Sequence, residues 1–213
     1  MTQPLRLGIA GLGTVGAGVV KIVRQKAALL EARGGRPIAI SAVCARSRGK
    51  DRGVPLDSYA WEDDPVALAQ RDDVDVFVEL MGGSDGPAKA STEAALRAGK
   101  DVVSANKALL AHHGQALAQA AEASESVLRY EAAVAGGIPV VKALTEGLAG
   151  NDIERVMGVM NGTCNYILTR MESAGLTYEE AFAEADCLGY LEADPNLDVG
   201  GIDAVHKLAL LAS

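Results

Sequence analysis

The first part of the chain alternates short apolar runs with segments whose apolar residues recur at helical spacing. Leu5–Ala10 is an apolar run, and after it comes an apolar stripe that extends to about residue 30. The stripe consists of Val15, Val19, Ile22, Val23 and Leu30. The pattern predicts strands at 5–10, 38–44, 74–80, 101–103 and 127–130, and helices at 14–30, 87–98 and from 106 through 117. Strands that alternate with helices are typical of an α/β fold with a doubly wound parallel sheet. We therefore predict one such domain over residues 1–133.

The remaining residues, 134–213, change character and predict a partial α+β domain. Glu154–Met160 has the pattern of a strand, and 164–171, 178–186 and 202–212 have the pattern of helices. In the last helix an apolar face is expected to be buried, with Asp203, His206 and Lys207 on the opposite face. The chain ends inside this apolar helical pattern without a glycine or proline stop signal. We therefore expect it to be a shortened form of a longer protein. The residues expected on the buried face are Ile202, Val205, Leu208 and Ala212.

Composition excludes several classes of function. The longest runs without a charged side chain are 14 residues, for example Leu7–Val20, whereas a membrane span needs about 20 apolar residues. The net charge is −8, from 20 basic and 28 acidic residues, and an acidic chain repels the phosphate backbone of nucleic acids. Basic residues cluster once, at Arg46, Arg48, Lys50 and Arg52, which suits a single phosphate group and not a duplex.

Cysteine usage indicates a reducing compartment. Cys44, Cys164 and Cys187 are odd in number and widely spaced, which fits neither a disulfide framework nor a zinc site. The N-terminal residues lack the charged leader and apolar core of a secretory signal. We therefore expect a cytoplasmic location.

A glycine-rich motif, Gly11-x-Gly13-x-x-Gly16, follows the first predicted strand and opens the first predicted helix. In this context the glycines permit a tight turn, close approach of a pyrophosphate and close helix–strand packing. The helix N-terminus adds free N–H groups and partial positive charge. The alternative is a merely flexible turn. We predict a dinucleotide-binding site.

The end of the second predicted strand indicates which dinucleotide binds. An acidic residue there would hold the ribose 2′-hydroxyl of NAD, but the chain has Arg46 and Arg48 instead. Two arginines could hold the 2′-phosphate of NADP, so we predict that NADP is preferred over NAD. The alternative is an ordinary solvated basic loop.

Two lysines are candidates for the chemistry. Lys107 follows the fourth predicted strand near a helix N-terminus, where a cation is mildly unfavourable and therefore suggests another purpose. Ligands in such sheets bind outside the carboxyl ends of the strands. Lys207 lies four residues after Asp203 on the last helix. A surface ion pair is the simple explanation of that spacing, and a cleft-lining pair is the functional one.

Six motifs occur in order along the chain, namely Gly11-x-Gly13-x-x-Gly16, Ser104–Lys107, Glu131–Pro139, Asn161–Leu168, Leu188–Pro195 and Asp198–Lys207. Together they resemble the homoserine dehydrogenases, and the resemblance spans essentially the whole chain. Members of this family interconvert L-homoserine and L-aspartate 4-semialdehyde with NAD or NADP, in the threonine and methionine branch of amino-acid biosynthesis. The resemblance implies a Rossmann-type domain followed by a partial substrate-binding and dimerisation domain, and a homodimer in the full-length form. Family members continue past the last helix of this chain, and Cys164 stands where threonine is common.

The resemblance also assigns roles. Lys207 matches the catalytic lysine that donates a proton to the aldehyde oxygen, and Lys107 matches the lysine that contacts the cofactor and the reacting oxygen. Domain closure about a hinge near 131–139 would bring the reacting carbons together. For the cofactor we expect Gly11, Gly13, Thr14, Val15, Gly16, Arg46, Arg48, Gly83, Ser104 and Lys107. For the substrate and the catalytic lysine we expect Glu192, Asp198, Asp203, Asn161, Gly162, Thr163 and Tyr190. For a monovalent cation, usually sodium, we expect Glu131, Val134, Gly136 and Ile138.

Two alternatives remain open. One is another two-domain semialdehyde oxidoreductase that forms a thioester, which needs an activated cysteine such as Cys164. The other is a dinucleotide-binding module without turnover.

Overall fold

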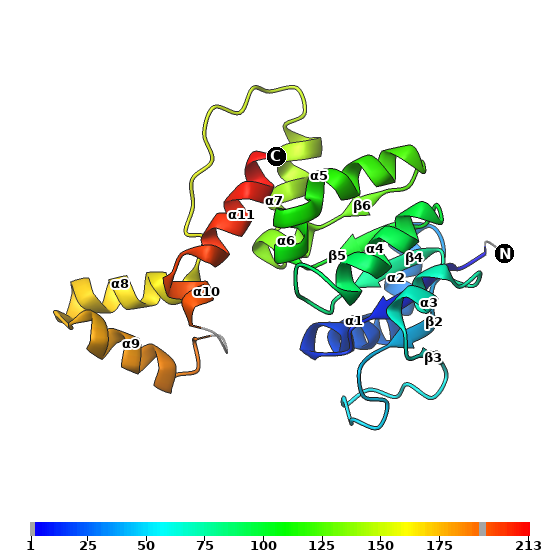
Figure 1. The fold of residues 1–213 in the computed structure, drawn as a ribbon, viewed down its shortest axis with the longest axis horizontal. Helices are drawn as coiled ribbons and strands as arrows, with labels where there is room; N and C mark the ends of the chain where they lie inside the picture. The colour runs from blue at the N-terminus through cyan, green and yellow to red at the C-terminus, as the bar shows by residue number, and fades with distance from the viewer. Residues whose placement is uncertain (1–2, 192–194) are drawn as a thin grey trace. The chain divides into compact units, whose positions relative to one another are not determined.

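The computed structural model describes residues 3–191 and 195–213. By their internal contacts the residues divide into two compact units, one ending at Lys142 and the other spanning Ala143–Ser213 (Figure 1). The sequence places the boundary at 133, inside helix α6 (Glu131–Ala135). The first unit extends further because α6 packs on the sheet and on the short helix α7 (Val140–Lys142).

The first unit is built on a six-stranded sheet in the order β3-β2-β1-β4-β5-β6. All five neighbouring pairs run parallel. This order confirms the predicted doubly wound parallel sheet, with the reversal of strand order beside β1, where such folds bind ligands. The strands are β1 (Leu5–Ala10), β2 (Ile38–Cys44), β3 (Ala60–Glu62), β4 (Val76–Glu79), β5 (Asp101–Ser104) and β6 (Leu128–Arg129).

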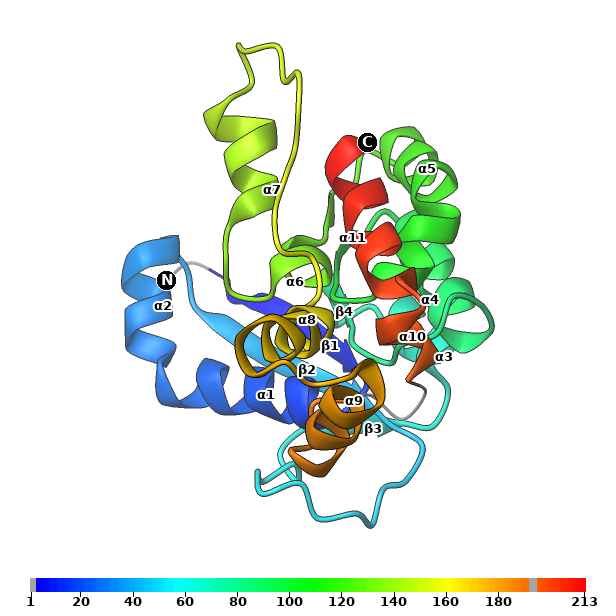
Figure 2. The same cartoon turned by 90° about the vertical axis from the view of Figure 1, so that its left-hand side faces the viewer.

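Helices cover both faces of this sheet. In Figure 2, α1 and α2 lie on one side of the strands, and α3, α4 and α5 lie on the other. Parallel strands covered on both faces are expected to be continuously apolar, and Ile9, Val43 and Phe77 are fully buried. The helices are α1 (Thr14–Gln25), α2 (Ala27–Gly34), α3 (Pro65–Gln70), α4 (Pro87–Arg97) and α5 (Lys107–Ala123).

Three sequence predictions for this unit were wrong or incomplete. The first helix does not run to residue 30, because it ends at Gln25 and α2 begins at Ala27. Its buried side is marked by Val20, whereas Val15 and Ile22 of the predicted stripe are exposed. The sequence also missed β3 and α3. β3 is only three residues long and shows no periodicity, but Asp64 before Pro65 is an ordinary helix start signal, and its Oδ1 accepts the N–H of Val66 at 3.0 Å.

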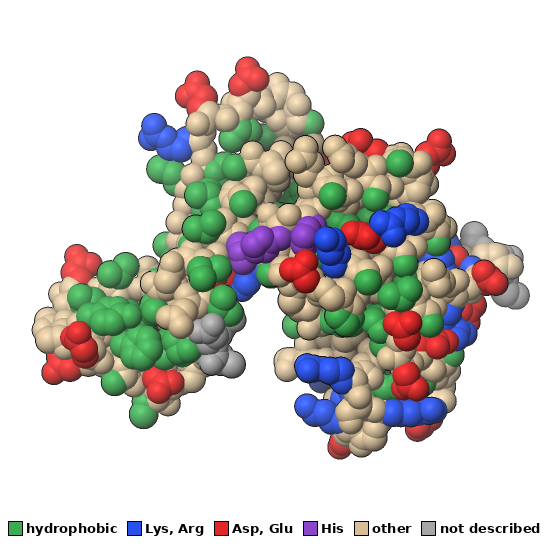
Figure 3. Space-filling model, viewed as in Figure 1, with side chains coloured by type: hydrophobic (Ala, Val, Ile, Leu, Met, Phe, Trp, Pro, Cys, Tyr) green, Lys and Arg blue, Asp and Glu red, His purple; other side chains and the backbone are tan. Residues whose placement is uncertain are grey.

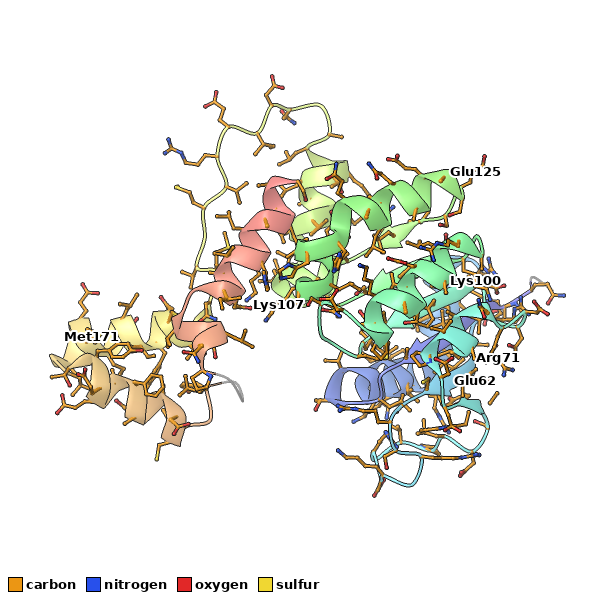
Figure 4. The ribbon with its side chains drawn as sticks, in the orientation of Figure 1. Glu62, Arg71, Lys100, Lys107, Glu125 and Met171 are labelled. Carbon is orange, nitrogen blue, oxygen red and sulfur yellow. The ribbon has the colours of Figure 1, made fainter. Side chains whose placement is uncertain are left out.

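A group of charges fastens β3 to the loops beside it. Arg71 pairs with both Glu62 and Asp73, and these carboxylates raise the pKa of the guanidinium. The Nζ of Lys100 donates to the backbone oxygen of Arg71, and burial lowers the pKa of Lys100. Glu62, Arg71 and Lys100 lie together in Figure 4. These bonds link β3 to the segments that follow α3 and α4, so the group stabilises the fold.

The second unit consists of short helices. A small core of Ile167, Ala181 and Ala185 joins α8 and α9, and α9 begins with a capping box between Thr177 and Glu180. The elements are a π-helical turn at Ala143–Gly147, α8 (Gly162–Ala174), α9 (Tyr178–Cys187), α10 (Asn196–Val199) and α11 (Ile202–Ala212).

Two predictions for this unit were wrong. Glu154–Met160 forms no strand, because a strand needs a partner for its backbone groups and none of the described segments pairs with it. The faces of α11 are also reversed, since Val205 is 64% exposed whereas Asp203 is 3% exposed. Ile202 and Leu208 are exposed with Val205, because the hydrogen bonds of Asp203 decide which side of the helix turns inward.

None of the helices in the described ranges 3–191 and 195–213 is both long and apolar enough to cross a membrane.

Candidate active site

The glycine-rich turn between β1 and α1 is shaped by close backbone contacts. Gly11 has φ +97°, and a Cβ there would lie 2.4 Å from the carbonyl oxygen of Leu80. A Cβ on Gly16 would lie 1.9 Å from the carbonyl oxygen of Gly11. A Cβ on Gly13, in contrast, would meet nothing within 4 Å. Gly11 and Gly16 are therefore required by the fold, while Gly13 leaves space against the backbone for a ligand.

The N-terminus of α1 has the properties of an anion site. Its N-cap is Gly13, which supplies no side-chain hydrogen bond, and the first turn contains no acidic residue. Thr14 and Val15 are exposed at this end. Open N–H groups and the helix dipole both attract a phosphate. The structure thus places the predicted cofactor residues 11–16 together in one turn.

A buried carboxylate organises the ends of β4 and β5. Glu79 is fully buried, and its Oε1 accepts the N–H groups of Met81 at 2.7 Å and Gly82 at 3.3 Å. Its Oε2 accepts the hydroxyl of Ser104 at 2.7 Å. Sequence reasoning missed Glu79, although an acidic residue at the end of a strand covered on both faces signals an internal partner.

Asn106 continues this network to Lys107. Its Nδ2 donates to the carbonyl of Gly83 at 2.7 Å, and its Oδ1 caps α5 by accepting the N–H of Leu109 at 3.1 Å. Its own N–H donates to the Oγ of Ser104 at 3.0 Å. Lys107 is therefore held at the first position of α5, half-buried, at the carboxyl end of β5 (Figure 4). The predicted residues Gly83, Ser104 and Lys107 are thus joined by one network.

The basic loop after β2 carries Arg46 and Arg48, both exposed. Lys and Arg side chains gather over this loop in Figure 3. It leaves the carboxyl end of β2, the neighbour of β1 in the sheet, where the 2′-position of a dinucleotide is read in such folds.

In the second unit a buried polar cluster surrounds Lys207. The Nδ2 of Asn161 donates to Asp198 Oδ1 and to Asp203 Oδ2, both at 2.9 Å. Lys207 Nζ donates to Asp203 Oδ2 and to the backbone oxygen of Met160, both at 2.8 Å. The two aspartates are each 3% exposed. Asp203 and Lys207 are therefore no surface ion pair.

Asn161 also positions the rest of the cluster through α8. As the N-cap of α8, its Oδ1 accepts the N–H of Cys164 at 2.8 Å. The thiol of Cys164 donates to the backbone oxygen of Asp198 at 3.2 Å. Burial, followed by Asp198 and Asp203, raises the pKa of this thiol. The environment disfavours a thiolate at Cys164, which argues against a nucleophilic role.

Beside this cluster, a cavity of about 500 Å³ opens on α8. Thr163 Oγ1 donates to the backbone oxygen of Tyr190 at 2.8 Å, and the rings of Tyr166 and Tyr190 meet edge to face with centroids 4.9 Å apart. Predicted Gly162, Thr163 and Tyr190 therefore line one depression, and Asn165, Tyr166 and Thr169 complete its lining. The predicted Glu192 lies outside the described residues.

The predicted cation residues cluster around α6. The carboxylate of Glu131 accepts the N–H groups of Val141 and Lys142, each at 2.9 Å. Val134 is buried near the C-terminal end of α6, where Gly136 is the C-cap with φ +59°, and Ile138 follows it exposed. Carbonyl oxygens at a helix C-terminus carry partial negative charge, which fits a monovalent cation. The described part of the chain contains no group of three or more His, Cys, Asp or Glu residues that could hold a metal.

Comparisons with known proteins agree with this geometry. Residues 11–131 match the family model for the NAD-binding domain of homoserine dehydrogenase, and residues 139–213 match the homoserine dehydrogenase model. The homoserine dehydrogenase of Mycobacterium tuberculosis is 48% identical over 211 residues, covering 99% of this chain and 47% of that protein. That of Pseudomonas aeruginosa is 44% identical over 214 residues, covering 99% of this chain and 48% of that protein.

Solved structures of homoserine dehydrogenases are also similar to this chain. A homoserine dehydrogenase from Thiobacillus denitrificans superimposes with a TM-score of 0.92 at 40% identity, covering 99% of this chain and 48% of that one. A hyperthermophilic archaeal homoserine dehydrogenase in complex with NADPH superimposes with a TM-score of 0.85 at 28% identity, covering 98% of this chain and 69% of that one. The chain spans about half the length of the curated relatives it matches.

Proposed function

Since this chain belongs to the homoserine dehydrogenase family, a family of oxidoreductases, we propose that it interconverts L-homoserine and L-aspartate 4-semialdehyde with NADP. This reaction belongs to the branch of amino-acid biosynthesis that leads to threonine and methionine. The observation that carries the proposal is the buried cluster of Asn161, Asp203 and Lys207. It supports the proposal because it holds an ammonium group in one position, and a developing alkoxide needs a proton and a positive charge.

Lys207 is the proposed proton donor. An ammonium group has three N–H donors, and two of them bond to Asp203 and to the carbonyl of Met160. The third is then directed at the aldehyde oxygen during reduction, and the neutral amine accepts the proton back during oxidation. Asp203 holds the charge in place, and Asn161 in turn holds Asp203. For the ammonium group of the substrate we propose Glu192 and Asp198, with Gly162, Thr163 and Tyr190 beside it.

The first unit supplies the cofactor site. The glycine-rich turn and the N-terminus of α1 bind the pyrophosphate, and the network of Glu79, Ser104 and Asn106 presents Lys107 to the reacting oxygen. A bound nicotinamide dinucleotide supplies the hydride chemistry. The protein binds the cofactor and the substrate and orients their reacting groups.

We propose that NADP is preferred because Arg46 and Arg48 stand where an NAD-binding chain would have a carboxylate. The NADPH complex of the archaeal relative supports the proposal. Replacing both arginines with alanine should weaken NADP binding and leave NAD binding nearly unchanged, as measured by equilibrium titration. An equal loss for both cofactors would contradict the assignment.

Three further features belong to the proposal. Sodium would bind the carbonyl oxygens of Val134, Gly136 and Ile138, with Glu131 supplying negative charge, and the test is a titration of activity with sodium against lithium. A homodimer would cover the exposed apolar residues of α11, and sedimentation at several concentrations tests it. Free thiols at Cys44, Cys164 and Cys187 suit a cytoplasmic location.

One assay separates the enzyme from a binding module without turnover. Homoserine-dependent reduction of NADP, followed by the absorbance of NADPH, should be present in the protein and absent when homoserine is omitted. NADP binding without turnover would favour the module. A thioester intermediate trapped on Cys164 would favour a semialdehyde oxidoreductase of the thioester type.

A further inference from the structure

One arginine of the basic loop differs from its neighbours because the backbone surrounds it. The loop connects β2 to β3, and Arg46 and Arg48 are exposed on it, whereas Arg52 is half-buried. All three kinds of guanidinium nitrogen in Arg52 donate to backbone carbonyls. Nε donates to Leu12 at 3.1 Å, Nη1 to Lys50 at 2.7 Å and Nη2 to Ser47 at 2.5 Å.

The position of two of these acceptors is informative. Leu12 lies between Gly11 and Gly13, in the turn proposed for the pyrophosphate. Ser47 lies between Arg46 and Arg48, the two residues proposed for the 2′-phosphate. One planar side chain therefore joins the two places at which the same cofactor would present its anionic groups. Three of the five N–H donors of the Arg52 guanidinium bind backbone oxygens, so Arg52 connects the glycine-rich turn to the basic loop.

Trp61 on β3 extends the connection. The guanidinium carbon of Arg52 lies 5.6 Å from the centroid of the Trp61 ring, and that of Arg48 lies 5.8 Å from it. The indole Nε1 donates to Asp63 at 2.9 Å, which fixes the ring. A cation held over an aromatic face within about 6 Å is attracted to it. Trp61 thus limits the freedom of Arg48 as well as that of Arg52.

We propose that Arg52 is a positioning residue that determines cofactor specificity, because it fixes the loop of Arg46 and Arg48 at a set distance from the glycine-rich turn. The inference rests on the proposed preference for NADP. A loop that is ordered before the cofactor binds loses less conformational entropy on binding. That gain is greatest for the 2′-phosphate, because the exposed loop of Arg46 and Arg48 depends on Arg52, whereas the glycine-rich turn is also held by the close backbone contacts of Gly11 and Gly16.

The test compares two fragments that differ only in the 2′-phosphate, namely adenosine 2′,5′-bisphosphate and 5′-AMP. Trp61 is the only tryptophan of the chain, so its fluorescence reports on this loop, and calorimetric titration gives the affinities independently. The informative variant is Arg52→Lys, which keeps the positive charge but lacks the planar fork that reaches three carbonyls. Arg52→Ala removes both the charge and the fork. Arg24→Ala is the matched control, since Arg24 makes a single exposed hydrogen bond to the same loop, at Pro55.

We expect the natural chain to bind the bisphosphate more tightly than 5′-AMP. Arg52→Lys should weaken binding of the bisphosphate about tenfold, or about 1.4 kcal/mol. The affinity for 5′-AMP should change less than about twofold. Arg24→Ala should change neither. Full selectivity in Arg52→Lys with a loss confined to Arg52→Ala would show that charge alone matters, and would overturn the proposal. An equal loss of affinity for both fragments would show that Arg52 only stabilises the fold, and would also overturn the proposal. A natural chain without selectivity would overturn the NADP preference itself and this inference with it.

Discussion

Replacement of Lys207 gives the most direct test of the proposed chemistry. Lys207→Ala removes the proposed proton donor together with the partner of a carboxylate that is 3% exposed. Lys207→Arg keeps a positive charge, but a guanidinium stays protonated and cannot exchange a proton near neutral pH. The two variants therefore separate proton transfer from charge.

The structure sets the expected magnitudes. Breaking a buried ion pair by removing one partner costs about 3–5 kcal/mol. Here the Lys207 side chain is 23% exposed, and Asp203 keeps its bond from Asn161 at 2.9 Å. We therefore expect Lys207→Ala to lower the free energy of unfolding by about 2 kcal/mol. Loss of general acid catalysis should reduce kcat by about 10²–10⁴-fold, and Lys207→Arg should not restore it.

The assay is homoserine-dependent NADP reduction, paired with urea denaturation and NADP titration of each variant. NADP binding should survive, because the glycine-rich turn belongs to the other unit. Arg170→Ala is the matched control, since it removes a half-exposed ion pair with Glu184 on α8 and α9. It should leave kcat unchanged and destabilise the protein less than Lys207→Ala. A Lys207→Ala variant with near-normal kcat would refute the reasoning and make Lys107 the first candidate.

Three other outcomes follow from the geometry. Gly13→Ala should leave the thermal midpoint unchanged and weaken dinucleotide binding, whereas Gly16→Ala should lower the midpoint because its Cβ would lie 1.9 Å from a carbonyl oxygen; calorimetry with and without NADP distinguishes the two. A thiol reagent at neutral pH should modify the exposed Cys187 before Cys164, whose pKa is raised, and mass spectrometry of the modified peptides would show the reverse order if this is wrong. An arginine partner lowers the pKa of Asp75, so this group stabilises the fold above the unfolded pKa of about 3.9 and loses that contribution as the pH falls through its folded pKa. Asp75→Asn should therefore flatten the acid side of the stability profile, and an unchanged acid titration would contradict the assignment.

The sequence alone determined the features that depend on neighbours along the chain. The strand ranges 5–10 and 38–44 and the helix range 202–212 agree with the structure, because apolar runs and helical periodicity are local properties. The glycine-rich turn was equally predictable, since the motif is contained within six residues and its strand and helix flank it directly. Even here the local signal failed for β3, which is too short to show a period.

Tertiary structure decided which distant groups meet. Asn161 reaches Asp198 and Asp203 across 37 and 42 residues, and Glu79 reaches Ser104 across 25. No periodicity in the sequence encodes these pairs. The same bonds keep Asp203 on the buried face of α11 and leave Ile202, Val205 and Leu208 exposed, because a buried carboxylate must be hydrogen-bonded. Arg52 is another example. The proposed role of Arg52 depends on its hydrogen bond to the carbonyl of Leu12, 40 residues earlier, and only folding brings the two groups together.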